Sequence, residues 1–203
     1  MSGETWEVSE LLDELRRDSV YHEESAGGVT FSGGEPLAAS NAAFVLACLR
    51  ELKEQRVHTA VDTCGSVQTE TLLAAAAISD LVLFDLKIMD PVRHKQATGH
   101  GNALILHNLT ELLAAGHKVW IRVPLIPGQT SDMENLLAAA EFLGNQEHMP
   151  PVYLLPYHGI GADKYRRLGR TNPLPDVQEL ASAEIESCAE VFRARGLKVQ
   201  MGG

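Results

Sequence analysis

Short runs rich in β-branched and aromatic residues alternate with longer amphipathic runs along most of this chain. The short runs predict strands at residues 29–32, 57–63, 81–87, 118–127, 152–158 and 197–201. The longer runs have apolar residues at helical spacing and predict helices at residues 7–24, 41–56, 68–78, 102–115, 132–144 and 176–195. Gly116 and Gly196 follow two of these runs as natural C-terminal caps. Strands separated by single helices predict βαβ units and a parallel sheet.

The order of these elements predicts the architecture. Right-handed crossovers would wind such a chain into a barrel or an open doubly wound sheet. The sequence has no internal repeat, low-complexity stretch or interdomain linker, so we expect one domain over residues 1–203. The first predicted element is a helix, with no strand before it.

Composition narrows the possible function classes. The chain has 203 residues and a net charge of −10, which argues against a nucleic-acid binder because such proteins usually carry a basic face. No apolar run reaches the length of a membrane-spanning helix, and the N-terminus does not have the pattern of a secretory signal. Three isolated cysteines form neither a disulfide framework nor a metal motif, so a cytoplasmic location is expected.

The stretch GGVTFSGGEP at residues 27–36 carries the strongest local signal. Its pattern predicts a short strand that runs into a glycine turn with one acid, Glu35. Gly33 and Gly34 leave the backbone bare, so a ligand could approach it closely. A carboxylate beside exposed carbonyls suits an ammonium group, whereas a phosphate prefers backbone N–H groups. An ordinary strand-to-helix turn is the alternative.

Further polar residues follow the later strands. In parallel α/β barrels the C-terminal strand ends open on one face, where catalytic groups collect. His158 could equally be a loop histidine with its hydrogen bonds satisfied. The polar residues at successive strand ends are Glu35, Asp62, Thr63, Asp85, Lys87, Arg122 and His158.

These residues also have structural interpretations. Asp62 and Thr63 could simply terminate a strand. Asp85 and Lys87 are two apart and would share one face of a strand, where they could form an ion pair. Arg122 could cover the edge of the sheet. Their joint arrangement favours a site for a zwitterionic small molecule.

Five strings, in this order, resemble the activating enzymes of glycyl radical enzymes, which belong to the radical S-adenosylmethionine (radical SAM) superfamily. The resemblance covers nearly the whole chain, and it implies a partial (β/α)6 TIM-like barrel. The strings are GGVTFSGGEP at 27–36, VDTCG at 61–65, DLVLFDLK at 80–87, VWIRVPLIPG at 119–128 and LLPYHGIGADKYRRLG at 154–169.

The resemblance also implies site roles. Gly33, Gly34 and Glu35 would hold the methionyl ammonium of S-adenosylmethionine. The positions that would contact the rest of that cofactor, its adenine or the incoming peptide are Asp62, Lys87, Arg122, Ile126 and His158. A monovalent cation would be held by Asp62, Thr63, the carbonyl of Leu83, and Asp85.

The chain departs from the family pattern in one respect. Family members carry a C-x3-C-x2-C motif whose three thiolates hold a [4Fe-4S] cluster, and no such spacing occurs here. The motif lies on the first barrel strand and its loop, ahead of the opening helix. We therefore expect that this chain lacks the first strand and the cluster segment, and that alone it is inactive.

The implied activity is reductive cleavage of S-adenosylmethionine to a 5′-deoxyadenosyl radical, which would install a glycyl radical on a partner enzyme. That partner would resemble formate C-acetyltransferase or a diol or choline lyase, and a flavodoxin or ferredoxin would supply the electron. Two alternatives stay open. One is a non-catalytic module that binds the cofactor or a partner. The other is an aldolase-like barrel with Lys87 as a Schiff-base lysine and with Asp62 and His158 as acid–base groups.

Overall fold

The computed structural model describes residues 5–17, 27–157 and 177–202. The chain divides into two compact units. The first unit comprises Met1–Phe84 and Leu104–Val119, and the second comprises Asp85–Ala103 and Trp120–Gly203. The prediction of a single domain stays a prediction.

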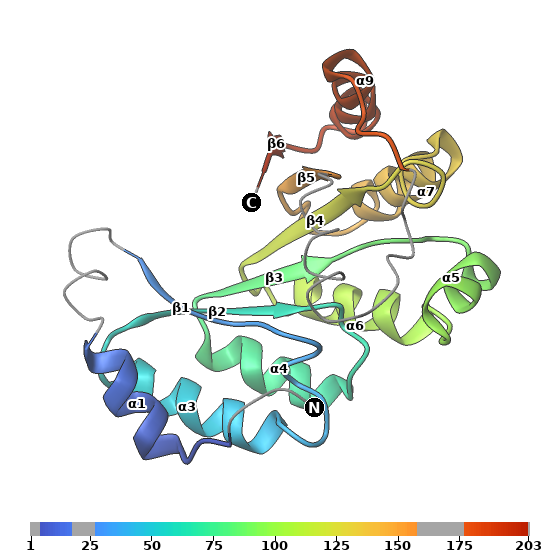
Figure 1. Ribbon diagram of the computed structural model, residues 1–203. Helices are drawn as coiled ribbons and strands as arrows, with labels where there is room; N and C mark the ends of the chain where they lie inside the picture. Colours follow the sequence, from blue (N-terminus) through green and yellow to red (C-terminus); the bar gives the residue numbers. More distant parts are fainter. Residues whose placement is uncertain (1–4, 18–26, 158–176, 203) are drawn as a thin grey trace. The chain divides into compact units, whose positions relative to one another are not determined.

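The first unit consists of three parallel strands with helices packed on them. Its strands are β1 (Gly28–Phe31), β2 (His58–Thr63) and β3 (Leu81–Asp85, whose last residue falls in the second unit), and they lie in the order β1-β2-β3. Its helices are α1 (Val8–Arg17), α3 (Ala42–Glu54), α4 (Thr69–Ile78) and α6 (Ala103–Ala114, from Leu104 onwards). Helix α3 packs on α1, on α4 and on β2, and these helices lie on one side of the strands (Figure 1).

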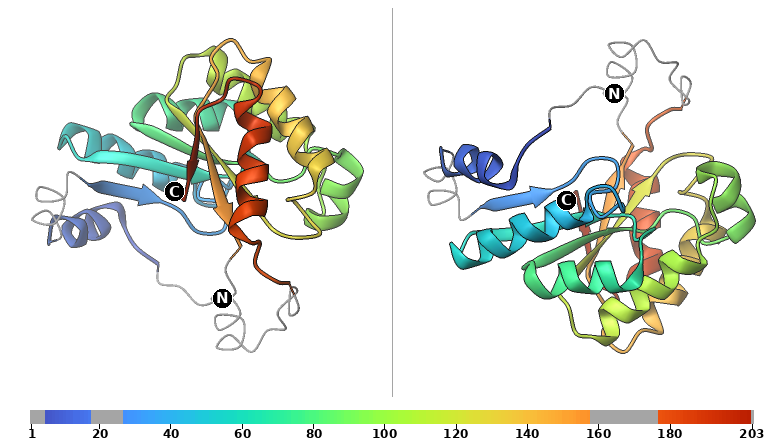
Figure 2. Two further views of the ribbon diagram at one scale, coloured as in Figure 1. Left: turned by 90° about the horizontal axis from the view of Figure 1, so that it is seen from above. Right: turned by 90° about the horizontal axis from the view of Figure 1, so that it is seen from below.

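The second unit repeats this arrangement. Its strands are β4 (Val119–Leu125, whose first residue falls in the first unit), β5 (Val152–Pro156) and β6 (Val199–Met201), and they pair in parallel in the order β4-β5-β6. Its helices are α5 (Pro91–Thr98), α7 (Met133–Gly144) and α9 (Ser182–Arg193). Helix α9 packs beside α7 and against β5 and β6 (Figure 2).

Burial along the strands shows which side chains build the cores and which are left for a site. In β4 the residues Val119, Ile121, Val123 and Leu125 are buried, while the residues between them, Arg122 included, are half-buried. Successive side chains of a strand point to opposite faces, so Arg122 lies on the face away from these four residues. The alternation anticipated from the sequence therefore appears in β4, and it is what separates Arg122 from the core.

The elements agree with the sequence pattern except in three places. Helix α5 was not predicted, because its residues lack an apolar stripe; it begins at Pro91, with the Asp90 side chain accepting from the Arg93 N–H. Strand β3 ends at Asp85, so Lys87 lies beyond the strand on which it was expected. Helix α9 begins at Ser182, later than predicted.

The predicted C-terminal caps are confirmed. Gly116 and Gly196, which follow α6 and α9, have φ values of 73° and 81°. An L-residue adopts this left-handed conformation only at a cost, which is why glycine ends helices so often.

Candidate functional site

The carboxylate of Glu35 is fixed at the end of β2. It accepts hydrogen bonds from the Thr63 hydroxyl, at 2.8 Å to Oε1 and 2.9 Å to Oε2, and from the Cys64 N–H, at 3.0 Å to Oε2. The Cys64 thiol lies 3.2 Å from Oε2, and the Leu37 N–H donates to Oε1 at 3.3 Å. Among the described residues no lysine or arginine contacts Glu35, so its donors are all neutral.

The glycines before Glu35 are open on their side-chain positions. A Cβ built on Gly33 or Gly34 would meet no described atom within 4 Å, and Gly33 has a φ of 133°, where glycine is favoured. The backbone of this turn is therefore accessible to a ligand, as the sequence predicted. Both glycines and Ser32 are exposed, while Glu35 is half-buried.

Asp62 lies on β2 beside the same turn. Its Oδ2 accepts a hydrogen bond of 2.9 Å from the Ser32 hydroxyl. In the parallel pairing of β2 with β3 it is the register partner of Leu83, so these two residues share one face of the strands. The first unit thus brings together Gly33, Gly34, Glu35, Asp62, Thr63 and Leu83.

A second group of charged residues forms around Asp85 in the second unit. The Arg122 guanidinium donates to Asp85 Oδ1 through Nε at 2.9 Å and through Nη2 at 2.8 Å. The Lys87 Nζ lies 3.5 Å from Asp85 Oδ2. The side chains of Asp85 and Arg122 are 21% and 18% exposed, and that of Lys87 is 41% exposed. The ion pair between Asp85 and Lys87 that the spacing suggested is confirmed.

Two buried asparagines hold the segment that carries Lys87. The Asn135 amide nitrogen donates to the carbonyls of Lys87, at 2.8 Å, and Thr130, at 2.9 Å, while its oxygen accepts from the Met89 N–H at 2.8 Å. The Asn102 amide nitrogen donates to the carbonyls of Ile88 and Met89. Sequence reasoning missed both residues, because each stands as one polar position in or beside a helix.

Ile126, the predicted contact to the adenine, begins the loop after β4. Its N–H donates to the hydroxyl of the buried Thr130 at 2.9 Å, and its carbonyl accepts from the N–H groups of Gln129 and Thr130. These bonds fix the loop without using the Ile126 side chain, which is half-buried. His158 lies outside the described residues.

The cysteines do not fit an iron–sulfur cluster. Cys48 is buried in α3 and Cys188 in α9, while Cys64 follows β2. Burial raises the pKa of the Cys48 and Cys188 thiols, which keeps them protonated at neutral pH, and a thiol must ionise to bind iron. Within the described part of the chain, no three His, Cys, Asp or Glu side chains are grouped as metal ligands.

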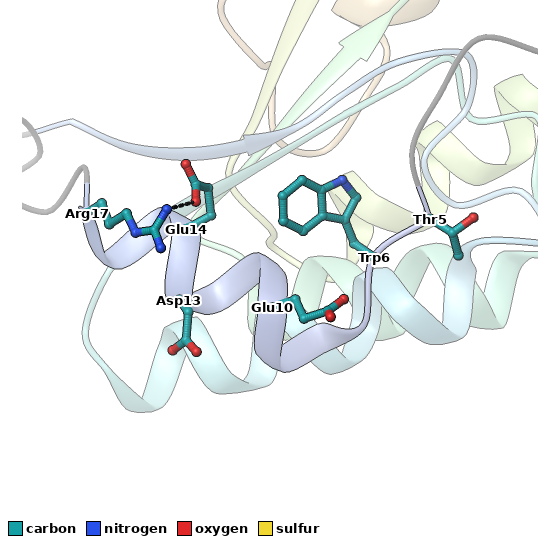
Figure 3. A pocket seen from close by; sticks show the side chains of 6 residues that line it. All are labelled: Thr5, Trp6, Glu10, Asp13, Glu14 and Arg17. Atoms are coloured by element: carbon teal, nitrogen blue, oxygen red, sulfur yellow. Dashed lines mark hydrogen bonds and ion pairs between the residues drawn. The ribbon is translucent and has the colours of Figure 1, made fainter.

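Two pockets lie on the first unit, apart from Glu35 and Asp62. Figure 3 shows one of about 550 Å³ beside α1, in which the Arg17 guanidinium pairs with Glu14 at 2.5 Å. The other, of about 470 Å³, is lined by Phe31, Ser32 and Pro36 and by apolar residues of α1 and α3. Neither has a described site acid in its lining, so the candidate site is defined by the strand ends.

A family model for the radical SAM superfamily matches residues 3–140. The choline trimethylamine-lyase activating enzyme of Oleidesulfovibrio alaskensis is 40% identical over 194 residues, covering 94% of this chain and 62% of that protein. The pyruvate formate-lyase 2-activating enzyme of Escherichia coli (strain K12) is 36% identical over 201 residues, covering 99% of this chain and 68% of that protein. The chain spans 55% to 68% of the length of such curated relatives.

A solved structure agrees with these likenesses. A domain of a pyruvate-formate lyase-activating enzyme from Bacteroides vulgatus superposes with a TM-score of 0.74 at 33% identity, over 87% of this chain and 99% of that domain. The likeness confirms the predicted α/β fold, a partial barrel of the radical SAM type. Among the described helices, none has the length and apolar character needed to span a membrane.

Proposed function

The chain belongs to the radical SAM superfamily, and we propose that it is the S-adenosylmethionine-binding part of an activating enzyme for a glycyl radical enzyme. Its relatives are named for activating pyruvate formate-lyase, choline trimethylamine-lyase and trans-4-hydroxy-L-proline dehydratase. Family membership also favours this interpretation over an aldolase with Lys87 as a Schiff-base lysine.

The observation that carries the proposal is the environment of Glu35. Its carboxylate is half-buried, its described hydrogen-bond donors are neutral, and it follows two glycines with open space beside them. A half-buried carboxylate without a cationic partner favours a ligand cation, and the ammonium of S-adenosylmethionine meets that need. Gly33 and Gly34 would let the ligand approach the backbone.

The remaining site residues would serve the rest of the cofactor. We assign Asp62 in the first unit, and Lys87, Arg122 and Ile126 in the second, to contacts with its other groups or with the incoming peptide, together with His158. In the family, S-adenosylmethionine supplies on reductive cleavage the radical that removes a hydrogen from a partner's glycine. The share of these residues is to bind and orient the cofactor.

No electron-transfer step is assigned to this chain. The [4Fe-4S] cluster of the family needs three thiolates at close spacing, and the three cysteines here lie on separate elements with two of them buried. This mismatch favours one alternative, a module that binds cofactor or partner without redox activity. The presence of Glu35, Asp62, Asp85 and Lys87 together supports the activating-enzyme interpretation instead.

A monovalent cation belongs to the proposal as well. Its ligands would be Asp62, Thr63 and the Leu83 carbonyl, with Asp85. The support is the resemblance and the register pairing of Asp62 with Leu83. Such a cation would make S-adenosylmethionine binding depend on potassium or sodium.

The partner and setting follow from the same likeness. We propose a glycyl radical enzyme as the protein acted on, a flavodoxin or ferredoxin as the electron donor, and the cytoplasm as the compartment. Three free cysteines support a reducing compartment.

The test is equilibrium binding to this chain of S-adenosylmethionine and of 5′-methylthioadenosine, which lacks the ammonium and the carboxylate. Glu35→Ala should weaken binding of S-adenosylmethionine by roughly a hundredfold, because a buried ammonium loses its anion. Binding of 5′-methylthioadenosine should not change. The control is Glu54→Ala, which removes an exposed acid from α3. Failure of the wild-type chain to bind S-adenosylmethionine, or unchanged affinity in Glu35→Ala, would overturn the proposal.

A further inference from the structure

A buried asparagine in α6 holds the loop that follows β2. Asn108 is 0% exposed, and its amide nitrogen donates to the carbonyls of Gly65 and Val67, each at 2.8 Å. Its amide oxygen accepts from the Thr69 hydroxyl at 2.7 Å. A buried amide with these bonds satisfied constrains the segment it contacts, because breaking any of them leaves a polar group without a partner. The Asn108 side chain therefore fixes residues 65–69.

Gly65 passes this constraint to Thr63. Its φ of 72° is in the left-handed region, and a Cβ at this position would lie 2.3 Å from Cζ of Phe84. Neither the backbone nor the neighbouring ring leaves room for another residue. In this conformation the Gly65 N–H donates to the Thr63 hydroxyl oxygen at 2.9 Å.

The Thr63 hydroxyl in turn orients Glu35. Because it accepts from Gly65, its single proton is free for the carboxylate, where it lies 2.8 Å from Oε1 and 2.9 Å from Oε2. The next residue, Cys64, adds its N–H at 3.0 Å to Oε2. Thr63 is 2% exposed, so water does not compete strongly for its hydroxyl.

We propose that Thr63 and Asn108 are positioning residues that hold the Glu35 carboxylate in the orientation that receives a ligand ammonium. The inference rests on the proposed function for its ligand and on the hydrogen-bonded chain from Asn108 to Glu35 for its geometry. It gives Thr63 a role different from the cation-ligand role that the resemblance implies, since the Thr63 proton is directed to Glu35.

The first measurement needs no ligand. Amide hydrogen exchange of Cys64 and Gly65 reports the two bonds to Glu35 and Thr63 directly. Thr63→Val should speed exchange at both amides about tenfold, because one acceptor is lost and the other is no longer held. Thr63→Ser keeps the hydroxyl and should restore the wild-type rates. Asn108→Ala should speed exchange at Gly65.

The matched control is Thr59→Val. Thr59 lies on the same strand, is 0% exposed and receives the same substitution, but its hydroxyl bonds to Asp80 rather than to Glu35. It should leave exchange at Cys64 and Gly65 unchanged even where it lowers the stability of the protein.

The second measurement separates positioning from cation binding. Thr63→Val and Asn108→Ala should each weaken S-adenosylmethionine binding about tenfold and leave 5′-methylthioadenosine binding unchanged. High potassium chloride should not restore the loss. In the Glu35→Ala background neither substitution should weaken binding further, because the group they position is gone.

The outcomes divide cleanly. Unchanged exchange at Cys64 and Gly65 in Thr63→Val, or recovery of its affinity in potassium chloride, would overturn the positioning role. If the wild-type chain does not bind S-adenosylmethionine, the proposed function fails, and the exchange rates alone decide the positioning role. If Asn108→Ala does not fold, the Thr63 series decides.

Discussion

The acids Glu35 and Asp85 differ in what holds them. Glu35, in the first unit, is held by a hydroxyl and backbone N–H groups, and no described cation contacts it. Asp85, in the second unit, is held by the guanidinium of Arg122 and the ammonium of Lys87. Neutral donors orient a carboxylate and leave its charge available, whereas two cations neutralise it. Glu35 is therefore the better receptor for a ligand ammonium.

The two units nevertheless share a way of holding these residues in place. In each, a buried asparagine donates its amide hydrogens to two backbone carbonyls beside a site residue: Asn108 in the first unit and Asn135 in the second. The units thus use the same support for different electrostatics. Substitutions at the acids and at the asparagines can separate the electrostatic difference from the shared support.

The largest expected effect is that of removing Asp85. Asp85→Ala leaves the Arg122 guanidinium, which is 18% exposed, without its carboxylate. The free energy of unfolding should fall by about 3 kcal/mol, as for other buried pairs that lose one partner. Glu35→Ala should cost only about 1–2 kcal/mol, because it leaves neutral donors unpaired. Urea denaturation measures both.

The double variant Asp85→Ala with Arg122→Ala checks the cause. If the unpaired guanidinium is responsible, the double variant should lose less stability than the two single losses combined. Equal losses in Asp85→Ala and Glu35→Ala would remove the distinction between the two acids.

The second prediction concerns the shared support. Asn135→Ala should lower the free energy of unfolding by about 2 kcal/mol, because the Met89 N–H and the Lys87 carbonyl lose their partner. Amide exchange should quicken at Met89. Asn145→Ala changes an exposed asparagine at the end of the same helix and should do neither. A slow Met89 amide in Asn135→Ala would contradict the role of Asn135.

The sequence predicted what depends on neighbours along the chain. The alternation in β4, the cap glycines and the pairing of Lys87 with Asp85 all follow from spacings of a few residues. The contact of Arg122 with Asp85 spans 37 residues and depends on how the chain folds. Spacing alone could not show that Arg122 has this partner.

The residues that the sequence missed are polar groups satisfied at long range. Asn108 stands among leucines in a helical run and resembles one surface position, yet it is fully buried and bonds to residues 41 and 43 positions away. The bond from Thr63 to Glu35 spans 28 residues and depends on β1 lying beside β2. Helix α5 was missed because it has no apolar stripe to mark it.

The third prediction is a pH effect confined to the second unit. The hydrogen bond from Arg93, and then the Asn135 N–H, hold the pKa of Asp132 below its ordinary value. A lowered carboxyl pKa contributes stability above the ordinary aspartate pKa, and that contribution is lost as the pH falls through the lower folded value. At neutral pH Asp132→Asn, which keeps a good cap, should cost about 0.5–1 kcal/mol.

Acid titration of the stability checks this assignment. The difference between wild type and Asp132→Asn should shrink as the pH falls below the ordinary aspartate range and should be constant between pH values of about 6 and 8. A difference that stays constant into acid would mean that Asp132 acts through its cap alone.

The smallest expected effect is a gain in the first unit. Arg56 follows α3 with a φ of 59°, and it is the one non-glycine residue with positive φ in the described part of the chain. Left-handed backbone is costly for an L-residue and easy for glycine, so Arg56→Gly should raise the free energy of unfolding by about 0.5 kcal/mol. Arg50→Gly makes the same substitution at an exposed helical position of α3 and should lower it by about 1 kcal/mol. Amide exchange should locate the gain of Arg56→Gly in the first unit, with Met89 unchanged. A gain of equal size at Met89 would mean that the two units unfold together, and the two acids would then have to be compared within one cooperative structure. Opposite signs for the two substitutions, with the gain confined to the first unit, would establish that each unit can be tuned by itself.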